Sequence, residues 1–163
     1  WCIVGADADC QRARRSLDLA DLYGLPFQDP LEESVNIHQR RVTFRGLRIM
    51  GLEGSRWYNG GPFQYRDHQM RKMIWRMMPG LWLGGGVDIV VTHAPPRHVH
   101  DAEDRCHRGF DSFLKLISRF KPSYLIHGHI HAHFTDPSQR MTRVGHTCVI
   151  NTFASHILEV EHD

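Results

Sequence analysis

Histidines are the residues of this sequence whose number and spacing most clearly point to chemistry. The chain has 13 of them in 163 residues. His93 ends an apolar run and precedes two prolines, while His129 and His131 lie in the stretch Gly128-His129-Ile130-His131. Neutral imidazole is a good ligand for divalent ions such as Zn, Fe and Mn. We predict that His93, His129 and His131 bind a metal; the alternative is loop histidines bonded to backbone carbonyls or solvent.

Two expected strands bring these histidines to one edge of a sheet. Residues 87–92 are a nearly continuous β-branched run, typical of a strand covered on both faces, and residues 123–126 predict a second strand. A strand-helix-strand unit is right-handed, so the two strands are parallel neighbours whose carboxyl ends share an edge. In an extended segment alternate side chains point the same way, which would place His131 beside His129. His127 supports the ligands or merely ends the strand.

The remaining elements alternate between strand and helix. Hydrophobic spacing predicts a helix between the two strands, with Phe110, Phe113 and Phe120 on its apolar face, and Pro122 follows it. Together the patterns predict one α/β domain over residues 1–163. Its other elements are a strand at 2–4, a helix at 11–23, a hairpin of 41–44 and 47–52 around Arg45-Gly46, a glycine-rich loop at 53–62, and a helix at 65–78 ended by Pro79-Gly80.

Composition excludes several classes of protein. With 41% hydrophobic and 23% charged residues, the chain is an ordinary globular domain. No apolar run approaches the roughly 20 residues of a membrane span, and a net charge of +2 does not argue for nucleic-acid binding, although it does not exclude it. The four cysteines lack CxxC spacing, so we expect free thiols and a cytoplasmic location. Because the chain begins at Trp1, we expect residues upstream to be missing.

Two motifs carry a resemblance to a known family. Residues 91–96 (Val-Thr-His-Ala-Pro-Pro) and 128–131 (Gly-His-Ile-His) resemble the last two signature motifs of the calcineurin-like metallophosphoesterases. Stretches 51–55, 101–104 with 107–110, and 151–156 resemble a bacterial branch of that family. The resemblance implies a four-layer αββα sandwich of two mixed sheets flanked by helices, and a centre of two divalent metals, most often Mn, otherwise Fe or Zn. It implies that His93 and His129 bind the second metal and His131 the first.

At the family's earlier motifs, this sequence departs from the family pattern. Its Asp-x-His and Gly-Asp motifs are absent, so the N-terminal strands of the fold are expected to be missing from this chain. The Gly-Asn-His motif would fall at Gly5-Ala6-Asp7, where Ala6 has no atom to bind a metal. Asp7 stands where the family often has its catalytic histidine. Either the carboxylate of Asp7 or Asp9 replaces the missing asparagine as a ligand, or the second metal binds weakly. Both acids can equally serve as the N-cap of the helix that begins at Gln11.

The resemblance implies hydrolysis of a phosphomonoester or phosphodiester, such as a nucleotide, by a water that two metals activate. His107 and Asp7 are the candidates for protonating the leaving group, and Arg56 and Arg108 for binding phosphate. Two other readings are open. Ala6 favours a catalytically degraded relative that serves as a binding or regulatory module. A structural zinc module would need a fourth ligand, which the sequence does not show.

Overall fold

The structure is a computed structural model that describes residues 36–131, 134, 136–153 and 156–160. Residues 37–163 form one compact unit. The predicted strand at 2–4, the predicted helix at 11–23 and the motif around Asp7 lie outside the described residues. The prediction of a single domain over the whole chain is therefore not tested.

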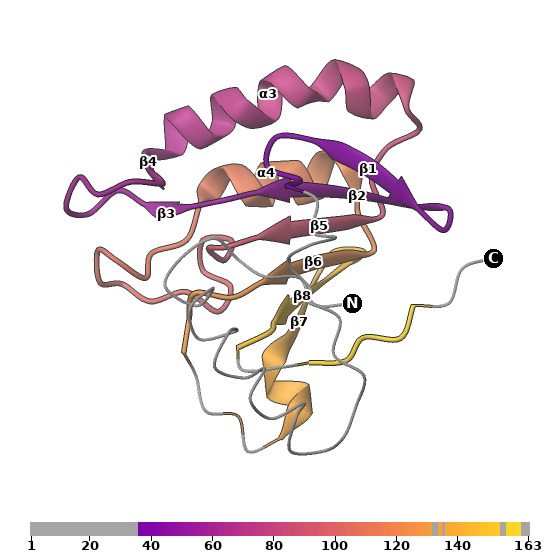
Figure 1. Ribbon diagram of the computed structural model, residues 1–163. Helices are drawn as coiled ribbons and strands as arrows, with labels where there is room; N and C mark the ends of the chain where they lie inside the picture. The colour runs from indigo at the N-terminus through magenta and orange to yellow at the C-terminus, as the bar shows by residue number, and fades with distance from the viewer. Residues whose placement is uncertain (1–35, 132–133, 135, 154–155, 161–163) are drawn as a thin grey trace, which may run out of the picture. The chain divides into compact units, whose positions relative to one another are not determined.

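A six-stranded mixed sheet forms the centre of this unit, with strand order β1-β2-β5-β6-β8-β7 (Figure 1). The four inner strands run parallel to one another, and each edge strand pairs antiparallel with its neighbour. The predicted parallel pair on either side of a helix is confirmed. The strands are β1 (Arg41–Phe44), β2 (Leu47–Leu52), β5 (Ile89–Thr92), β6 (Tyr124–His127), β7 (Met141–Val144) and β8 (Thr147–Asn151).

The predicted hairpin is confirmed with the predicted bounds. Arg45 and Gly46 connect β1 to β2, and both have positive φ values, 47° and 83°. A two-residue hairpin turn with positive φ at both positions matches the twist of the flanking strands. A short strand pair, β3 (Ser55–Arg56) with β4 (Gln64–Tyr65), brackets most of the predicted glycine-rich loop.

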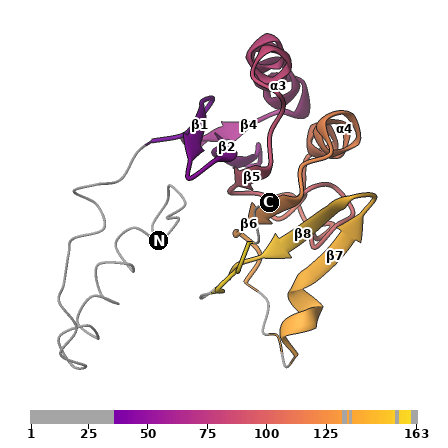
Figure 2. The same cartoon turned by 90° about the vertical axis from the view of Figure 1, so that its right-hand side faces the viewer.

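Two helices cover one face of the sheet, as Figures 1 and 2 show. They are α3 (Asp67–Leu83) and α4 (Asp111–Phe120), and a single-turn 3-10 helix, Pro137–Arg140, precedes β7. The apolar face of α4 is buried as predicted, and the rings of Phe110 and Phe113 lie 5.0 Å apart in the core. Other fully buried core side chains come from the inner strands and from α3, namely Met50, Met70, Leu81, Val90, Leu125, Val149 and Ile150.

The described residues thus give a central mixed sheet with two helices, and the four-layer arrangement stays a prediction. None of the helices within the described residues is long and apolar enough to cross a membrane.

The predicted end of the second helix is wrong. Instead of stopping at Pro79-Gly80, α3 continues through Pro79 to Leu83. The reason is tertiary burial, because the last turn places Leu81 in the core at 1% exposure. Proline cannot donate to the carbonyl of Trp75 one turn earlier, but Trp75 is exposed, so water can satisfy that carbonyl.

We expect Pro79→Ala to raise the free energy of unfolding by about 1 kcal/mol, because alanine restores the missing helical hydrogen bond and relieves the ring's clash with the preceding turn. The gain is smaller than for a mid-helix proline because Pro79 lies near the end of α3. Urea denaturation followed by circular dichroism measures it. A decrease in stability would show that Pro79 is needed for the path of this last turn.

Candidate functional site

The four parallel strands end in one row. The register pairs Leu52 with Thr92, Thr92 with His127, and His127 with Asn151. Backbone hydrogen bonds continue past this row: His93 N donates to Leu52 O at 3.3 Å and Gly128 N donates to His93 O at 3.1 Å. The loops that carry His93 and His129 therefore leave the sheet side by side at its carboxyl edge, as predicted.

His93 and His129 meet at this edge, with ring centroids 4.7 Å apart. His129 Nε2 lies 2.6 Å from the carbonyl oxygen of Cys106. Because a carbonyl only accepts, Nε2 carries the proton, and the neutral ring has its lone pair on Nδ1. Metal-binding histidines commonly donate their other ring nitrogen to a backbone carbonyl in this way. The environment of His129 therefore fits a metal ligand.

His131 is not brought to the same place. Its ring is exposed and stacks on Phe153 at a centroid distance of 4.5 Å. The expected extended conformation of this segment is wrong, because Ile130 N donates to Gly128 O at 2.7 Å around His129, whose φ is 65°. That is a tight three-residue turn, in which side chains do not alternate as they do in a strand. The role of His131 as a metal ligand stays a prediction.

The loop after β5 brings His107 to the site. Its two ends are fastened together by Asp101, which accepts from the Arg97 guanidinium at 2.7 Å and from Gly109 N at 2.9 Å. The Asp101 side chain is only 5% exposed. Between these anchors the loop turns back, so that the His107 ring lies 5.4 Å from the ring of His129. His107 was predicted to be catalytic, and the structure places it beside one of the predicted metal ligands.

Asp104 and Cys106, two neighbours of His107, were not predicted from the sequence as site residues. The Asp104 carboxylate contacts His107 Nδ1 at 2.9 Å and accepts from the Cys106 thiol at 2.8 Å. Hydrogen bonds from Cys106 and from His107 lower the pKa of Asp104, and the bond to Asp104 raises the pKa of the Cys106 thiol. The sequence signal for these residues is that an aspartate, a cysteine and a histidine, three residue types that bind metals, lie within four positions at 104–107. CxxC spacing alone does not reveal it.

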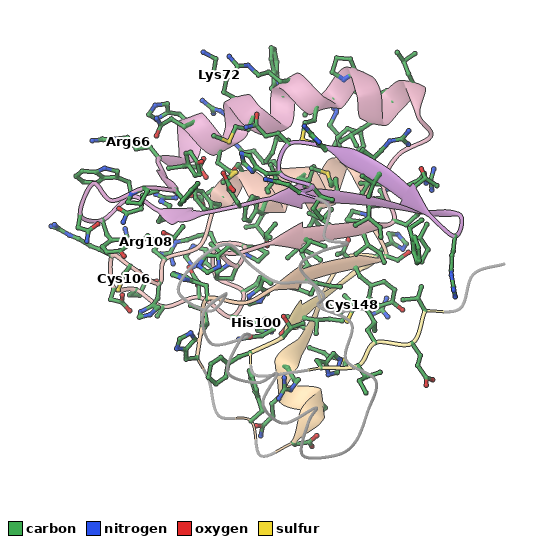
Figure 3. The ribbon with its side chains drawn as sticks, in the orientation of Figure 1. Arg66, Lys72, His100, Cys106, Arg108 and Cys148 are labelled. Atoms are coloured by element: carbon green, nitrogen blue, oxygen red, sulfur yellow. The ribbon has the colours of Figure 1, made fainter. Side chains whose placement is uncertain are left out.

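The two predicted phosphate-binding arginines lie in different settings. Arg56 Nη1 is 3.7 Å from Asp67, 3.5 Å from Asp111 and 3.3 Å from Gly109 O, so acidic groups already balance its charge. Arg108 is more exposed and donates to the carbonyl of Glu103 at 3.0 Å. Figure 3 shows Arg108 and Cys106 on the same side of the molecule. Substrate binding by either arginine stays a prediction, and Arg56 has a structural role as well.

A second pair of histidines, His100 and His127, lies next to the site. His127 is 1% exposed, and its Nδ1 lies 3.0 Å from Gly128 O. Its Nε2 lies 2.9 Å from Nδ1 of His100, whose Nε2 lies 2.8 Å from Thr142 Oγ1. Burial lowers the pKa of His127 to about 3, so this ring is neutral at physiological pH. His127 therefore supports the loop that carries His129. The role of His100 could not be predicted from nearby sequence, because both of its contacts are to residues far along the chain.

The described arrangement gathers three imidazoles, a thiol and a carboxylate at one sheet edge: His93, His129, His107, Cys106 and Asp104. Such a set can bind a divalent ion and exchange protons with a bound ester. Asp7, the other predicted catalytic residue, lies outside the described residues.

Sequence comparisons find relatives in animals. No protein-family model matches the chain. Over 107 residues, 64% of this chain and 31% of the relative, it is 31% identical to the human "Metallophosphoesterase domain-containing protein 1". It is 24% identical to a UPF0046 protein of Caenorhabditis elegans over 78% of this chain and 32% of that protein. The chain thus spans about a third of the length of the curated relatives it matches.

Comparison with solved structures supports the fold. The chain matches the crystal structure of TT1561 of Thermus thermophilus with a TM-score of 0.53 and 16% identity, covering 91% of this chain and 60% of that one. At this level of identity the likeness concerns the fold alone. In sequence, the chain is similar to proteins named for a metallophosphoesterase domain.

Proposed function

We propose that this chain carries the metal-binding edge of a metallophosphoesterase domain that hydrolyses a phosphomonoester or phosphodiester. The observation that carries the proposal is the meeting of His93 and His129, far apart in sequence, whose ring centroids lie 4.7 Å apart at the carboxyl ends of two parallel strands. The names of the curated relatives support the same reaction class. Because the chain spans only part of those relatives, the activity of the whole protein is part of this proposal.

His93 and His129 are the residues that would hold a divalent metal, with manganese expected before iron or zinc. Metals bound in a two-ion site neutralise phosphoryl oxygens and lower the pKa of a coordinated water. The chain's own contribution is to position groups around the ester. The turn at His129 holds its ring beside His93, and His107, whose ring lies 5.4 Å from that of His129, would give a proton to the leaving oxygen. Arg108, at the same loop, would bind an anionic oxygen of the substrate.

A binding or regulatory module without catalysis is the second candidate. Ala6 lacks a ligand atom where the family has asparagine, and Arg56, one of the two expected phosphate-binding groups, is paired with Asp67 and Asp111 instead. In that case the histidine edge would hold metal or anions without turnover.

The discriminating experiment is removal and return of the metal, using the natural protein that contains this chain. We expect chelation to abolish hydrolysis of bis(p-nitrophenyl) phosphate and manganese to restore it, because the proposed chemistry requires a bound divalent ion. Elemental analysis before and after chelation gives the metal content. A His146→Ala control, in the exposed turn at the opposite end of β8, should behave like the wild type. Metal binding without any turnover would favour the binding module, and absence of both would overturn the proposal.

A further inference from the structure

A compact set of donor atoms lies in the turn 104–107, next to the histidine edge. One oxygen of Asp104, the Cys106 sulfur and His107 Nδ1 all lie within 4.8 Å of one another. The individual separations are 2.8 Å from Cys106 Sγ to Asp104 Oδ1, 2.9 Å from His107 Nδ1 to that oxygen, and 3.5 Å from sulfur to nitrogen. These three side chains already converge on one point.

The separations suit a tetrahedral zinc ion. With Zn–S near 2.3 Å and Zn–N or Zn–O near 2.0 to 2.1 Å, the donor atoms of such a site lie about 3.3 to 3.6 Å apart. The sulfur–nitrogen separation already has this value, and the two contacts of the Asp104 carboxylate need to open by several tenths of an ångström. The side chains have room to do so, because Asp104 and His107 are 51% and 45% exposed.

Hydrogen bonds from backbone amides of the turn to the Asp104 side chain hold the three residues in place. Asp104 Oδ1 accepts from Cys106 N at 3.2 Å and from His107 N at 3.1 Å, which closes the turn. Asp101 fastens the loop that contains it to Arg97 and Gly109. The donors therefore start close together, so little conformational entropy would be lost when an ion binds.

The chemistry of the donors selects the ion. A thiolate and a carboxylate together offset the two charges of the cation, and a thiolate ligand favours zinc over manganese or magnesium, which prefer oxygen. His129 adjoins the turn, since its Nε2 lies 2.6 Å from the Cys106 carbonyl and its ring is 5.4 Å from that of His107. An ion in the turn would thus lie next to, but separate from, any metal at His93.

We propose that Asp104, Cys106 and His107 form a zinc-binding site of their own, with the remaining coordination position open to water or another ligand. The site depends on the side chains of this turn and does not require that the chain be a phosphoesterase. It adds a thiolate-containing position to an edge whose other donors are imidazoles.

Cobalt(II) is the probe, because a cobalt–thiolate bond gives a charge-transfer absorption that nitrogen and oxygen ligands do not produce. We expect titration of the reduced protein with cobalt to produce this absorption and zinc to displace it. Cys106→Ser should abolish the absorption, and Cys148→Ser, the matched control in β8, should keep it; Figure 3 shows the two cysteines well apart. Absence of the absorption in the wild type, or its persistence in Cys106→Ser, would overturn the proposal.

A second variant separates metal binding from a purely structural role of the turn. Asp104→Asn keeps the oxygen that accepts from the backbone amides but removes the negative charge. We expect it to keep its fold by circular dichroism and to bind cobalt at least tenfold more weakly. Unchanged affinity would contradict the assignment of Asp104. His93→Ala should retain the absorption, so that loss of the phosphoesterase metal and loss of this site give different results.

Discussion

The His129→Gly variant should lose manganese-dependent hydrolysis almost completely while remaining at least as stable as the wild type. The imidazole of His129 lies 4.7 Å from that of His93 and 5.4 Å from that of His107 (ring centroids), so its removal takes a proposed metal ligand from the edge. Loss of a group that merely orients a metal ligand typically costs 10- to 100-fold in affinity or activity, and loss of the ligand itself should exceed about 100-fold.

Stability should not fall, because the backbone at His129 favours glycine. Its φ of 65° lies in the left-handed region, which costs a residue with a Cβ about 1 to 2 kcal/mol. Glycine relieves that cost, and the greater entropy of the unfolded chain offsets about half of it. We therefore expect a free energy of unfolding that is unchanged or higher by up to about 1 kcal/mol.

Three measurements test this prediction together: turnover, metal content and urea denaturation. His146→Ala serves as the control for the loss of an exposed histidine, and His131→Ala tests whether the ring stacked on Phe153 also binds metal. Normal turnover in His129→Gly would contradict the site. Marked destabilisation would instead show that the His129 side chain stabilises the loop.

Gly109→Ala should give the largest loss of stability among the substitutions considered. A Cβ at this position would lie 2.5 Å from Pro96 O and 2.6 Å from Pro95 O, both rigid backbone atoms. Gly109 is buried and cannot move away freely, because its amide donates to Asp101 and its carbonyl accepts from Arg56. We expect the free energy of unfolding to fall by about 2 to 3 kcal/mol, a typical cost of forced overpacking.

The same substitution should also lower the affinity for cobalt, because it moves the loop that carries His107 away from the residues that follow His93. Urea denaturation and cobalt binding measure the two effects. Gly80→Ala is the matched control: a Cβ there meets no atom within 4 Å, and alanine in a helix should add about 0.5 to 1 kcal/mol. Equal stability of the two variants would contradict the close packing of Gly109 against the prolines.

Local patterns predicted much of this fold. The β-branched run at 87–92 and the apolar spacing of α4 identify the strand-helix-strand unit, and Arg45-Gly46 identifies the hairpin. The end of α3 was missed because a distant core buries Leu81 strongly enough to carry the helix past Pro79. Sequence spacing cannot report that burial.

The candidate site was predictable only where strand ends determine it. His93 and His129 follow neighbouring parallel strands, so their meeting was expected from topology. The position of His131 depends on a turn that long-range contacts hold, such as the bond from Asn151 Nδ2 to Ile130 O at 3.0 Å. Likewise, no local pattern links His100 with His127, since their contact joins residues 27 positions apart.

The hydrogen bonds of His127 have a direction that limits what they can transmit. The carbonyl of Gly128 only accepts, so His127 donates to it from Nδ1. His127 Nε2 then accepts a hydrogen bond from His100 Nδ1, and His100 Nε2 accepts one from the Thr142 hydroxyl. Burial lowers the pKa of both rings, which favours their neutral forms. The series ends at a backbone carbonyl, which accepts a hydrogen bond but does not take up a proton at physiological pH, so there is no group to which a proton could be passed. The series therefore has a structural role: it connects β7 to the turn at His129 and does not conduct protons to the site.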